Sequence, residues 1–581
     1  MMASRSPIAL IASTGLMICA TASAQINVDI PLAVGFPAPG LPSATVISLA
    51  TPTTNDYSVK AMVGTIAGPG ITSANNTMLW RVGTVAELVA RTGATLAGLP
   101  SGVTLSNIET PTVNNVGTIV FTGTLTGGPD VVASNNRAIF SGRPRSLRLV
   151  ARTGNQAPAQ ADGVRFASFD APRVGDNDQV VFLGTVAGPQ ITFNNNQVIV
   201  AGSASQLNTV ARTGTVVPGV PGAQFAILGD PVMSPQGIIA FTGVLQNFIG
   251  GVSSLDDVGV WRGTSDNMQL SDRASQWVPC LTHVGVIDSF SPTSINEDND
   301  VGYTAFLTPR LDTNAPNTLL VIRRGATGEL VPIAQSTQVL APGLQLGSIG
   351  TPRMSGQDNV AFIATVTGSG VNSTNNTAMF MRIANELSMV ARKGYQAPNC
   401  PVGVRFGDFS GVIVNRNGRV SFLCRLVGSG VDSTNDRALF SWDRLAGINL
   451  VVRTGNTAVL SPTDARQVGS IAVVMDSGNQ DGRPTSLGDD GVLVFQTTFT
   501  DGSTAVAARN INRALADIVG AGGMPPSDGT VDGDDIIAFI NAFGAGESTA
   551  DIVNGGGQEP PDGIVDGNDF IAFINAFAAG V

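Results

Sequence analysis

The chain has very few of the residues on which most catalytic and metal chemistry depends. Histidine occurs once, as His283, and cysteine four times in 581 residues. A Ser-His or Cys-His catalytic site would have to use that one histidine, and no G-x-S-x-G phrase accompanies it. We expect no zinc site on the same ground, because the cysteines are widely separated. We interpret His283 as a structural residue and assign no catalytic residue, although a site of paired carboxylates leaves no local signature and stays open.

Charge is also scarce and has one dominant sign. Charged residues make up 13%, the net charge is -11 and the pI is about 4.6. The basic residues are nearly all arginine and are scattered, whereas binding to nucleic acid needs them clustered. We therefore expect no nucleic acid partner.

Long apolar runs are absent apart from one near the start. Arg5 precedes the apolar stretch 8–20, and Ala22-Ser23-Ala24 forms a small-x-small cleavage site. Residues 1–24 are therefore predicted to be a signal peptide, too short to span a bilayer, and we expect no transmembrane segment and a secreted or cell-surface protein. Three cysteines, Cys280, Cys400 and Cys424, remain after the predicted signal peptide, and this odd number predicts no disulfide framework. A disulfide between Cys400 and Cys424 stays open. We expect Cys424 to be a small buried residue.

The abundant residues indicate a turn-rich β protein built from repeats. Hydrophobic residues make up 43%, with 69 Gly and 33 Pro. The phrase Ala-Arg-Thr-Gly or a close variant recurs about every 60 residues, which indicates a repeat architecture. Its arginines are Arg91, Arg152, Arg212, Arg273, Arg392 and Arg453.

A second phrase, a polar turn followed by an apolar run, occurs once in each of eight units. The runs end at Met62, Phe121, Phe182, Phe241, Phe306, Phe362, Phe422 and Phe495. Four strands are predicted for the third unit, at 166–174, 179–186, 197–202 and 207–212, with a tight turn between the first two. Four strands repeated eight times predict an all-β fold, an eight-bladed β-propeller over residues 25–512. An open solenoid, or seven blades and one stray unit, are the alternatives.

The ends of the repeat region predict how the ring closes. The eighth unit has no fourth strand of its own, and the segment from Val28 to Gly35 matches the fourth strand of the other units. We therefore expect the first strand to complete the last blade, which leaves no free edge.

The recurring polar and aromatic residues fit structural roles better than binding roles. We expect the repeated arginines to bond backbone carbonyls, and the paired asparagines, such as Asn75-Asn76 and Asn375-Asn376, to form turns. Trp80 and Trp261 align with core phenylalanines, so we expect packing rather than sugar stacking. Trp277 and Trp442 remain candidate surface aromatics.

Residues 513–581 contain one acidic segment twice, at a spacing of 34 residues. Each copy places carboxylates and carbonyls in a loop directly before a short apolar helix, as an EF-hand-type Ca²⁺ loop does. The predicted ligands of two Ca²⁺ sites are Asp517, Asp528, Thr530, Asp532 and Asp535 in the first copy, and Asp551, Asp562, Ile564, Asp566 and Asp569 in the second. The ligand at loop position 3 is open. The alternative is a polar turn whose Asp caps the helix.

This tail resembles a dockerin, closest to the variant found in planctomycete-type bacteria with GC-rich genomes. The repeat region resembles secreted tandem-repeat proteins with an N-x-x-G-x-x-A-F phrase, visible in 114–121, 355–362 and 415–422. The dockerin resemblance implies a cohesin-like partner contacted through Gly533, Asp534, Gly567 and Asn568. The tail departs from the dockerin pattern in the ten residues, 518–527, that separate the first two acids of the first copy.

These observations lead to one expected function and one alternative. We expect a non-enzymatic binding or structural protein, with a glycan as a candidate ligand of the propeller, tethered by its calcium module. The alternative is an extracellular polysaccharide-acting enzyme with a catalytic propeller on the same tether.

Overall fold

The computed structural model describes most of the repeat region and both C-terminal helices. The described residues are 29–281, 284–308, 316–356, 358–383, 385–444, 447–461, 464–475, 478, 480–511, 518, 533–547, 550–553 and 564–579. The predicted signal peptide and His283 lie outside them.

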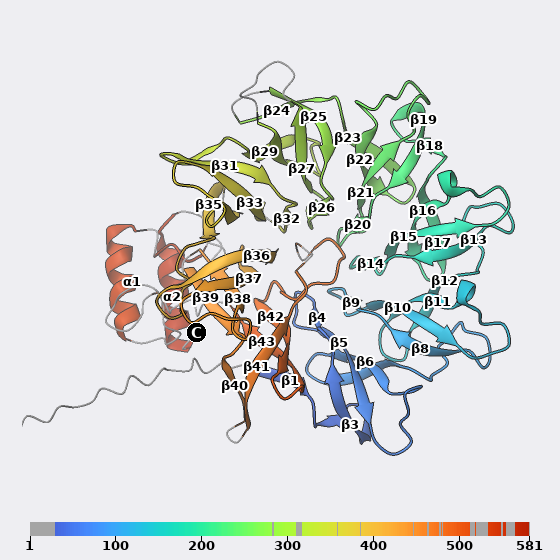
Figure 1. The fold of residues 1–581 in the computed structure, drawn as a ribbon, viewed down its shortest axis with the longest axis horizontal. Helices are drawn as coiled ribbons and strands as arrows, with labels where there is room; N and C mark the ends of the chain where they lie inside the picture. Colours follow the sequence, from blue (N-terminus) through green and yellow to red (C-terminus); the bar gives the residue numbers. More distant parts are fainter. Residues whose placement is uncertain are drawn as a thin grey trace, which may run out of the picture.

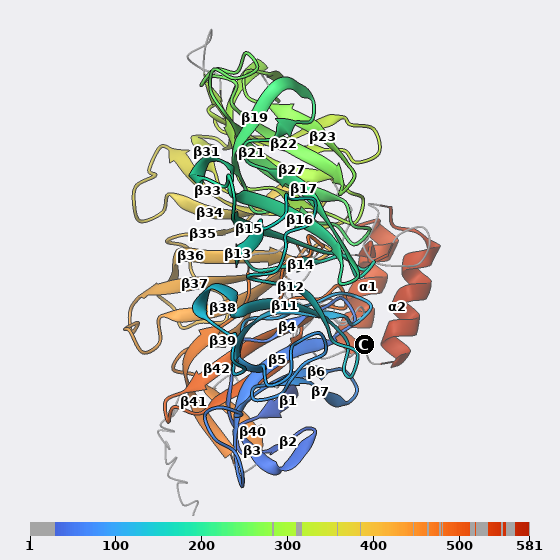
Figure 2. The same cartoon turned by 90° about the vertical axis from the view of Figure 1, so that its right-hand side faces the viewer.

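The strands form eight separate antiparallel sheets, and these blades stand around one axis as an eight-bladed β-propeller (Figure 1). Figure 2 shows the ring from its edge. Blade 1 comprises β2 (Pro37–Ala38), β3 (Leu41–Leu49), β4 (Thr53–Thr54), β5 (Lys60–Ala67), β6 (Thr77–Val82) and β7 (Ala86–Arg91). Blade 2 comprises β8 (Thr104–Ile108), β9 (Thr112–Val113), β10 (Ile119–Thr126), β11 (Arg137–Gly142) and β12 (Arg148–Arg152).

Blades 3 to 5 repeat this order. Blade 3 comprises β13 (Arg165–Phe169), β14 (Arg173–Val174), β15 (Val180–Ala187), β16 (Gln197–Ser203) and β17 (Gln206–Arg212). Blade 4 comprises β18 (Val216–Val217), β19 (Val220–Leu228), β20 (Val232–Met233), β21 (Ile239–Leu245), β22 (Val258–Thr264) and β23 (Asn267–Arg273). Blade 5 comprises β24 (Trp277–Pro279), β25 (Val284–Phe290), β26 (Ser294–Ile295), β27 (Val301–Thr308), β28 (Thr318–Arg323) and β29 (Leu330–Gln335).

Blades 6 to 8 complete the ring. Blade 6 comprises β30 (Val339–Ala341), β31 (Leu344–Ile349), β32 (Arg353–Met354), β33 (Val360–Gly368), β34 (Thr377–Ile383) and β35 (Glu386–Arg392). Blade 7 comprises β36 (Val404–Val414), β37 (Val420–Gly428), β38 (Arg437–Asp443) and β39 (Gly447–Arg453). Blade 8 comprises β40 (Thr457–Ser461), β41 (Asp464–Ala472), β42 (Val492–Phe499), β43 (Thr504–Asn510) and β1 (Asp29–Ala33). Short 3₁₀ helices lie at η1 (Ala133–Asn135) and η2 (Phe193–Asn195).

The first strand of most blades is broken, which corrects the single strand predicted at 166–174. In blade 3 the break falls at Pro172, between β13 and β14. Proline has no N–H to donate to a ladder. Blade 7 has Val412 at the matching position, and its first strand, β36, runs unbroken from Val404 to Val414. The break in blade 3 therefore coincides with the proline.

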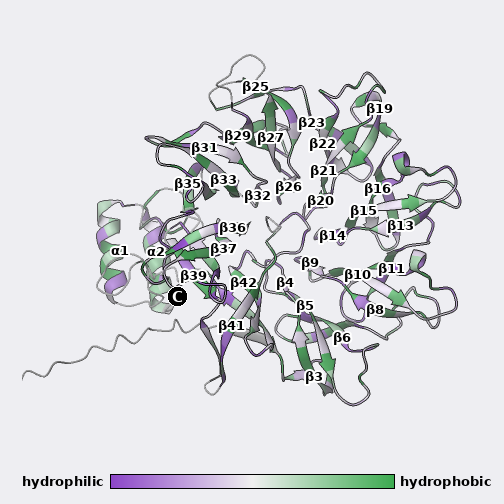
Figure 3. Ribbon diagram, in the orientation of Figure 1, coloured by the Kyte–Doolittle hydropathy of each residue, from purple (hydrophilic) through white to green (hydrophobic). Residues whose placement is uncertain are grey.

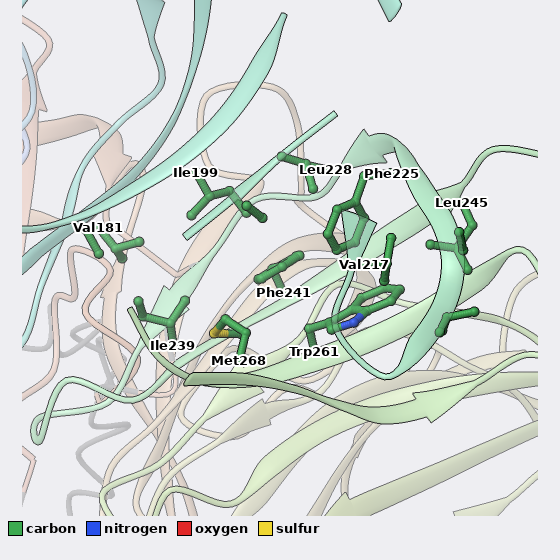
Figure 4. Packing of buried hydrophobic residues seen from close by; sticks show 14 of the residues in the cluster. Val181, Ile199, Val217, Phe225, Leu228, Ile239, Phe241, Leu245, Trp261 and Met268 are labelled. Atoms are coloured by element: carbon green, nitrogen blue, oxygen red, sulfur yellow. The ribbon is translucent and has the colours of Figure 1, made fainter. Parts of the chain in front are cut away.

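The hydrophobic core lies between adjacent blades rather than within one. Figure 4 shows Phe225, Phe241 and Trp261 of blade 4 packed with Val181 and Ile199 of blade 3. Figure 3 shows hydrophobic residues concentrated along the strands and the two helices. Each apolar run thus packs on a neighbouring blade, as its residues predict.

One core position differs from its prediction. Phe306 is 38% exposed, and Tyr303, fully buried on β27, takes the place that Phe121 has in blade 2. Tyr303 is the seventh residue after Asn296, as Phe121 is after Asn114. The register of the turn, rather than the nearest phenylalanine, sets the core position.

The ring closes as the sequence predicts. The strand β1 pairs antiparallel with β43, with Leu32 opposite Val506. Both residues pack in the same cluster as Met62 and Trp80 of blade 1. The first strand therefore joins the last blade to the first and covers the edge of β43.

Two helices follow the ring in the sequence, α1 (Gly533–Ala545) and α2 (Gly567–Ala579). The rings of Phe539 and Phe573 stack with centroids 3.9 Å apart and an interplanar angle of 3°. The two copies of the repeated segment thus pack together. Neither helix has the length and hydropathy needed to cross a lipid bilayer, within the described residues.

Candidate functional site

The turns between the first two strands form a ring of hydrogen bonds around the propeller axis. In blade 2, Asn114 Oδ1 accepts the N–H of Thr118 at 2.8 Å, and Asn114 Nδ2 donates to the carbonyl of Gly175 in blade 3 at 2.8 Å. Asn55 donates in the same way to the carbonyl of Asn114, and Asn415 to that of Gly488. One side chain thus closes its own turn and joins the next blade.

The fourth residue of each of these turns has a positive φ, which explains the glycine of the repeated phrase. Gly117, Gly237, Gly418 and Gly491 take the position in four blades, where a residue without Cβ meets no penalty. In the other blades the position holds Ser58, Asp178, Asn299 and Asp358, also at positive φ. The N-x-x-G phrase is therefore a ring-building element rather than a binding motif.

The axis itself is filled by an extended connection in blade 8, which we call the axial segment (residues 480–491) (Figure 1). The carbonyl of Asp481 accepts the N–H of Met233 in blade 4, and the carbonyl of Thr485 accepts that of Thr54 in blade 1. Gln480 Oε1 accepts the N–H of Glu297 in blade 5 at 3.0 Å. Sequence reasoning missed this plug; its signal is the spacing of 73 residues between Asn415 and Gly488, where other turns lie about 60 apart.

One cavity beside the axial segment, among the described residues, is too small for a substrate. A cavity of about 30 Å³ is lined by Asn55, Asn114, Asp176, Gln480, Arg483 and neighbouring residues. A single water needs about 10–15 Å³ measured in this way. The axial cavity can therefore hold about two waters and no sugar ring.

The carboxylates at the axis are engaged in hydrogen bonds. Asn115 Nδ2 donates to Asp56 Oδ2 at 2.6 Å and to Asp176 Oδ2 at 3.1 Å. Burial raises the pKa of Asp176, although hydrogen bonds from Asn115 oppose that rise. These two acids are bridged by one amide and hold neighbouring turns together.

A second pair of acids lies beside Arg173. The Arg173 guanidinium pairs with Asp230, and its side chain is only 9% exposed. The pKa of Asp170 is raised, first by burial and then by the charge of Asp230. One of these two acids is therefore held in an ion pair with Arg173.

A far larger pocket lies between blades 4 and 5. Its volume is about 530 Å³, within the range of small-molecule sites. The β22–β23 hairpin contributes Arg262, Asn267 and Gln269, and the end of β28 and the turn after it contribute Arg323 and Thr327. Its lining residues include two arginines and, among those described, no acid.

The repeated arginines and asparagines have the structural roles predicted for them. Arg91 Nε donates to the carbonyl of Asn75 at 2.7 Å, and Arg392 Nε to that of Asn375 at 2.8 Å. Asn75 Oδ1 accepts the N–H of Thr72, and its Nδ2 donates to the carbonyl of Gly70. The same contacts recur at Arg152, Arg212 and Arg453.

The tryptophans and cysteines also follow their sequence interpretation, except Trp442, a candidate surface aromatic that packs against a core cluster instead. Trp80 and Trp261 are fully buried, whereas Trp277 is 58% exposed and Trp442 packs against a core cluster. Cys424 is buried, and burial raises the pKa of its thiol. Cys400 packs against the same cluster, and both thiols are free.

The described part of the C-terminal tail shows how each copy is held together. Asp535 Oδ1 accepts the N–H of Ile518 at 2.8 Å, and Asp569 Oδ1 accepts that of Ile552 at 2.8 Å. Both acids are 1% exposed. Asp569 Oδ2 also accepts the N–H of Asp566, so both of its oxygens hold backbone groups in this arrangement. The two copies therefore share the same buried link between loop and helix.

The other predicted calcium ligands are placed only in part. Asp551 is 4% exposed and Ile564 is 62% exposed. Asp566 accepts the N–H of Asn568 and so caps α2, the alternative role considered for such an acid. Asp517, Asp528, Thr530, Asp532 and Asp562 lie outside the described residues. No three metal-ligating side chains come together within the described part of the chain.

The predicted partner residues lie at the starts of the helices. Gly533 and Gly567 are exposed, and Asp534 and Asn568 are half-buried. Each helix also exposes apolar residues. Ile540 is 52% exposed and Phe570 is 40% exposed, whereas Phe539 and Phe573 are fully buried.

Similar structures include an oligogalacturonate lyase in complex with manganese, with 12% identity and a TM-score of 0.32, covering 81% of this chain and 98% of that one. A puromycin-hydrolyzing peptidase of Mycobacterium tuberculosis has 11% identity and a TM-score of 0.36, and an acylaminoacyl peptidase of Pyrococcus horikoshii has 11% and 0.33. The alignments cover 82% and 70% of this chain, but only 61% and 52% of the two peptidases. These values are too low to bear on activity.

Sequence comparison identifies the repeat region. Among curated proteins, none matches this chain. One family model matches twice in succession, over residues 32–251 and 248–511. The first match ends inside blade 4, after β21, and the second continues from there through blade 8. The chain belongs to DUF7453, a family of unknown function.

Proposed function

We propose that this is an exported, non-enzymatic binding or structural protein. Its propeller presents a binding surface, and its C-terminal helix pair attaches it through two Ca²⁺ sites to a cohesin-like protein or another cell-surface partner. The signal peptide over residues 1–24 supplies the export step.

The duplicated link between loop and helix carries the tethering part of the proposal. Asp535 and Asp569 make the same contact with Ile518 and Ile552, 17 residues upstream of each. Each predicted loop carries several acids within a short stretch of sequence before its helix. Such acids repel one another unless a cation neutralises them, so ion binding contributes directly to folding.

The filled axis supports the non-enzymatic part. The axial segment occupies the channel, and the acids Asp56 and Asp176 are bridged by Asn115. A glycoside hydrolase of the common type acts through two carboxyl groups that flank the scissile bond in an open cleft.

Calcium titration of the full chain tests the tether. We expect calorimetry to give two Ca²⁺ per chain, and chelator to reduce the helical circular dichroism signal. The double variant Asp528→Asn/Asp562→Asn should lose this binding, whereas Asp162→Asn, an exposed acid of the propeller, should keep it. Absence of heat on titration, with helicity unchanged by chelator, would rule out the calcium tether.

Attachment is tested on the producing cells. The wild-type chain should stay on washed cells in calcium and appear in the medium after chelation. The double variant should be in the medium in both conditions. Equal retention of the two chains would refute calcium-dependent attachment.

A further inference from the structure

The pocket between blades 4 and 5 combines positive charge with hydrogen-bonding groups in a chain that is acidic overall. Two arginines, Arg262 and Arg323, line it, and no described lining residue is an acid. The whole chain, by contrast, has a net charge of -11.

The two lining arginines, Arg262 and Arg323, differ in their partners. Arg323 pairs with the fully buried Asp272, and Arg324 pairs with Asp300 and Asp358. No described carboxylate forms an ion pair with Arg262, whose Nη1 and Nη2 donate to the carbonyls of Arg324 and Gly325. A guanidinium has five N–H donors, so donors remain for a ligand. Burial lowers the pKa of Arg262, and the charge of Asp300 opposes that shift.

The rest of the lining suits a ligand with several hydroxyl groups. The side chains of Asn267, Gln269, Ser271 and Thr327 offer both donors and acceptors around the same hollow. The volume of about 530 Å³ is sufficient for one or two sugar rings. We infer that this pocket binds an acidic sugar, with Arg262 pairing with its carboxylate or sulfate group and the side-chain amides and hydroxyls receiving its hydroxyl groups. This inference deepens the binding role proposed for the propeller.

Calorimetric titration of the full chain with digalacturonate and with a sulfated disaccharide tests the inference. We expect at least one of these to bind, and both cellobiose, a neutral disaccharide, and acetate, a bare carboxylate, to bind at least tenfold more weakly. Failure of both acidic sugars to bind, or equal binding of cellobiose, would overturn the assignment. Equal binding of acetate would reduce the pocket to a simple anion site and also overturn it.

Substitutions test whether Arg262 pairs with the anionic group of the sugar. We expect Arg262→Gln to weaken binding about 10- to 100-fold, the range for a hydrogen bond to a charged group, and Arg262→Lys to weaken it less. Arg81→Gln is the matched control, because Arg81 holds the same register position in blade 1 and pairs with Glu87 there. Equal losses in Arg262→Gln and Arg81→Gln would contradict the role of this pocket.

A second variant separates ligand binding from blade packing. Gln269 is exposed on the lining, so Gln269→Ala leaves the Arg262 contacts with blade 5 intact and should weaken binding about 2- to 10-fold. The pocket lies in the propeller, whereas the proposed calcium sites lie in the C-terminal tail. The titrations are therefore repeated with chelator, and sugar binding should be unchanged. If the chain binds the sugar but no calcium, the pocket inference stands and the calcium tether is refuted. If the chain binds calcium but no sugar, the tether stands and the pocket inference is refuted.

Discussion

Replacing Asn114 by alanine should break one link of the ring around the axis. Asn114 is 5% exposed, and its side chain bonds the N–H of Thr118, the carbonyl of Gly175 and the carboxylate of Asp178. The first two partners are buried, and each buried group left without a partner costs about 1–3 kcal/mol. Asp178 is exposed and regains water. We expect Asn114→Ala to lower the free energy of unfolding by about 3 kcal/mol.

Urea denaturation of the full chain measures this loss through tryptophan fluorescence, since Trp80 and Trp261 are fully buried and report on the ring. Asn177→Ala is the control, because Asn177 lies in the next axial turn but is exposed, and should change stability by no more than about 0.5 kcal/mol. Asn415→Ala should repeat the Asn114 result, since Asn415 makes the same two contacts in blade 7. An Asn114→Ala chain no less stable than Asn177→Ala would refute the hydrogen-bonded ring.

Three further predictions concern the closure of the ring, the packing of its core and the pH dependence of its stability. Deleting β1 (Asp29–Ala33) should expose the edge of β43, lower the urea midpoint and increase light scattering. Trp261→Ala should cost about 3–5 kcal/mol, whereas Trp277→Ala, at a site 58% exposed, should cost less than about 0.5 kcal/mol. The pKa of Asp176 is raised in the folded state, so its ionisation opposes folding, and the stability of Asp176→Asn relative to wild type should grow as the pH rises from about 4 through that raised pKa.

Each of these has an outcome that contradicts it. Removal of β1 without effect on scattering or midpoint would mean that the ring does not need its first strand. Equal losses in the two tryptophan variants would contradict the buried position of Trp261. A stability difference for Asp176→Asn that is constant or shrinks with rising pH would have the wrong sign for a raised pKa.

The fold was largely predictable because its signals are local and repeated. The apolar runs, the turn residues and the recurring arginines identify one blade, and eight copies make the pattern clear. Local reading failed where two residues compete for one position, as at Phe306 and Tyr303, or where one proline interrupts a strand, as at Pro172. The structural roles of Arg91 and Asn75 were also predictable, since both belong to one blade.

The candidate sites were less predictable because they depend on contacts between blades. Nothing near Arg262 in the sequence shows that its guanidinium lies against the turn after β28, about 60 residues away. Likewise, Arg483 donates to the carbonyl of Thr293, 190 residues earlier. The calcium ligands are a different case, since their duplication is visible in the sequence and remains a prediction for titration.

The sequence by itself determined the blade, the number of units and the strand that closes the ring, because hydrophobic periodicity and turn chemistry act within a few residues. Only the tertiary structure decided what fills the axis and where an open pocket remains. Those outcomes depend on which carbonyls, amides and charges the closed ring brings together from different blades, and no local pattern records that geometry.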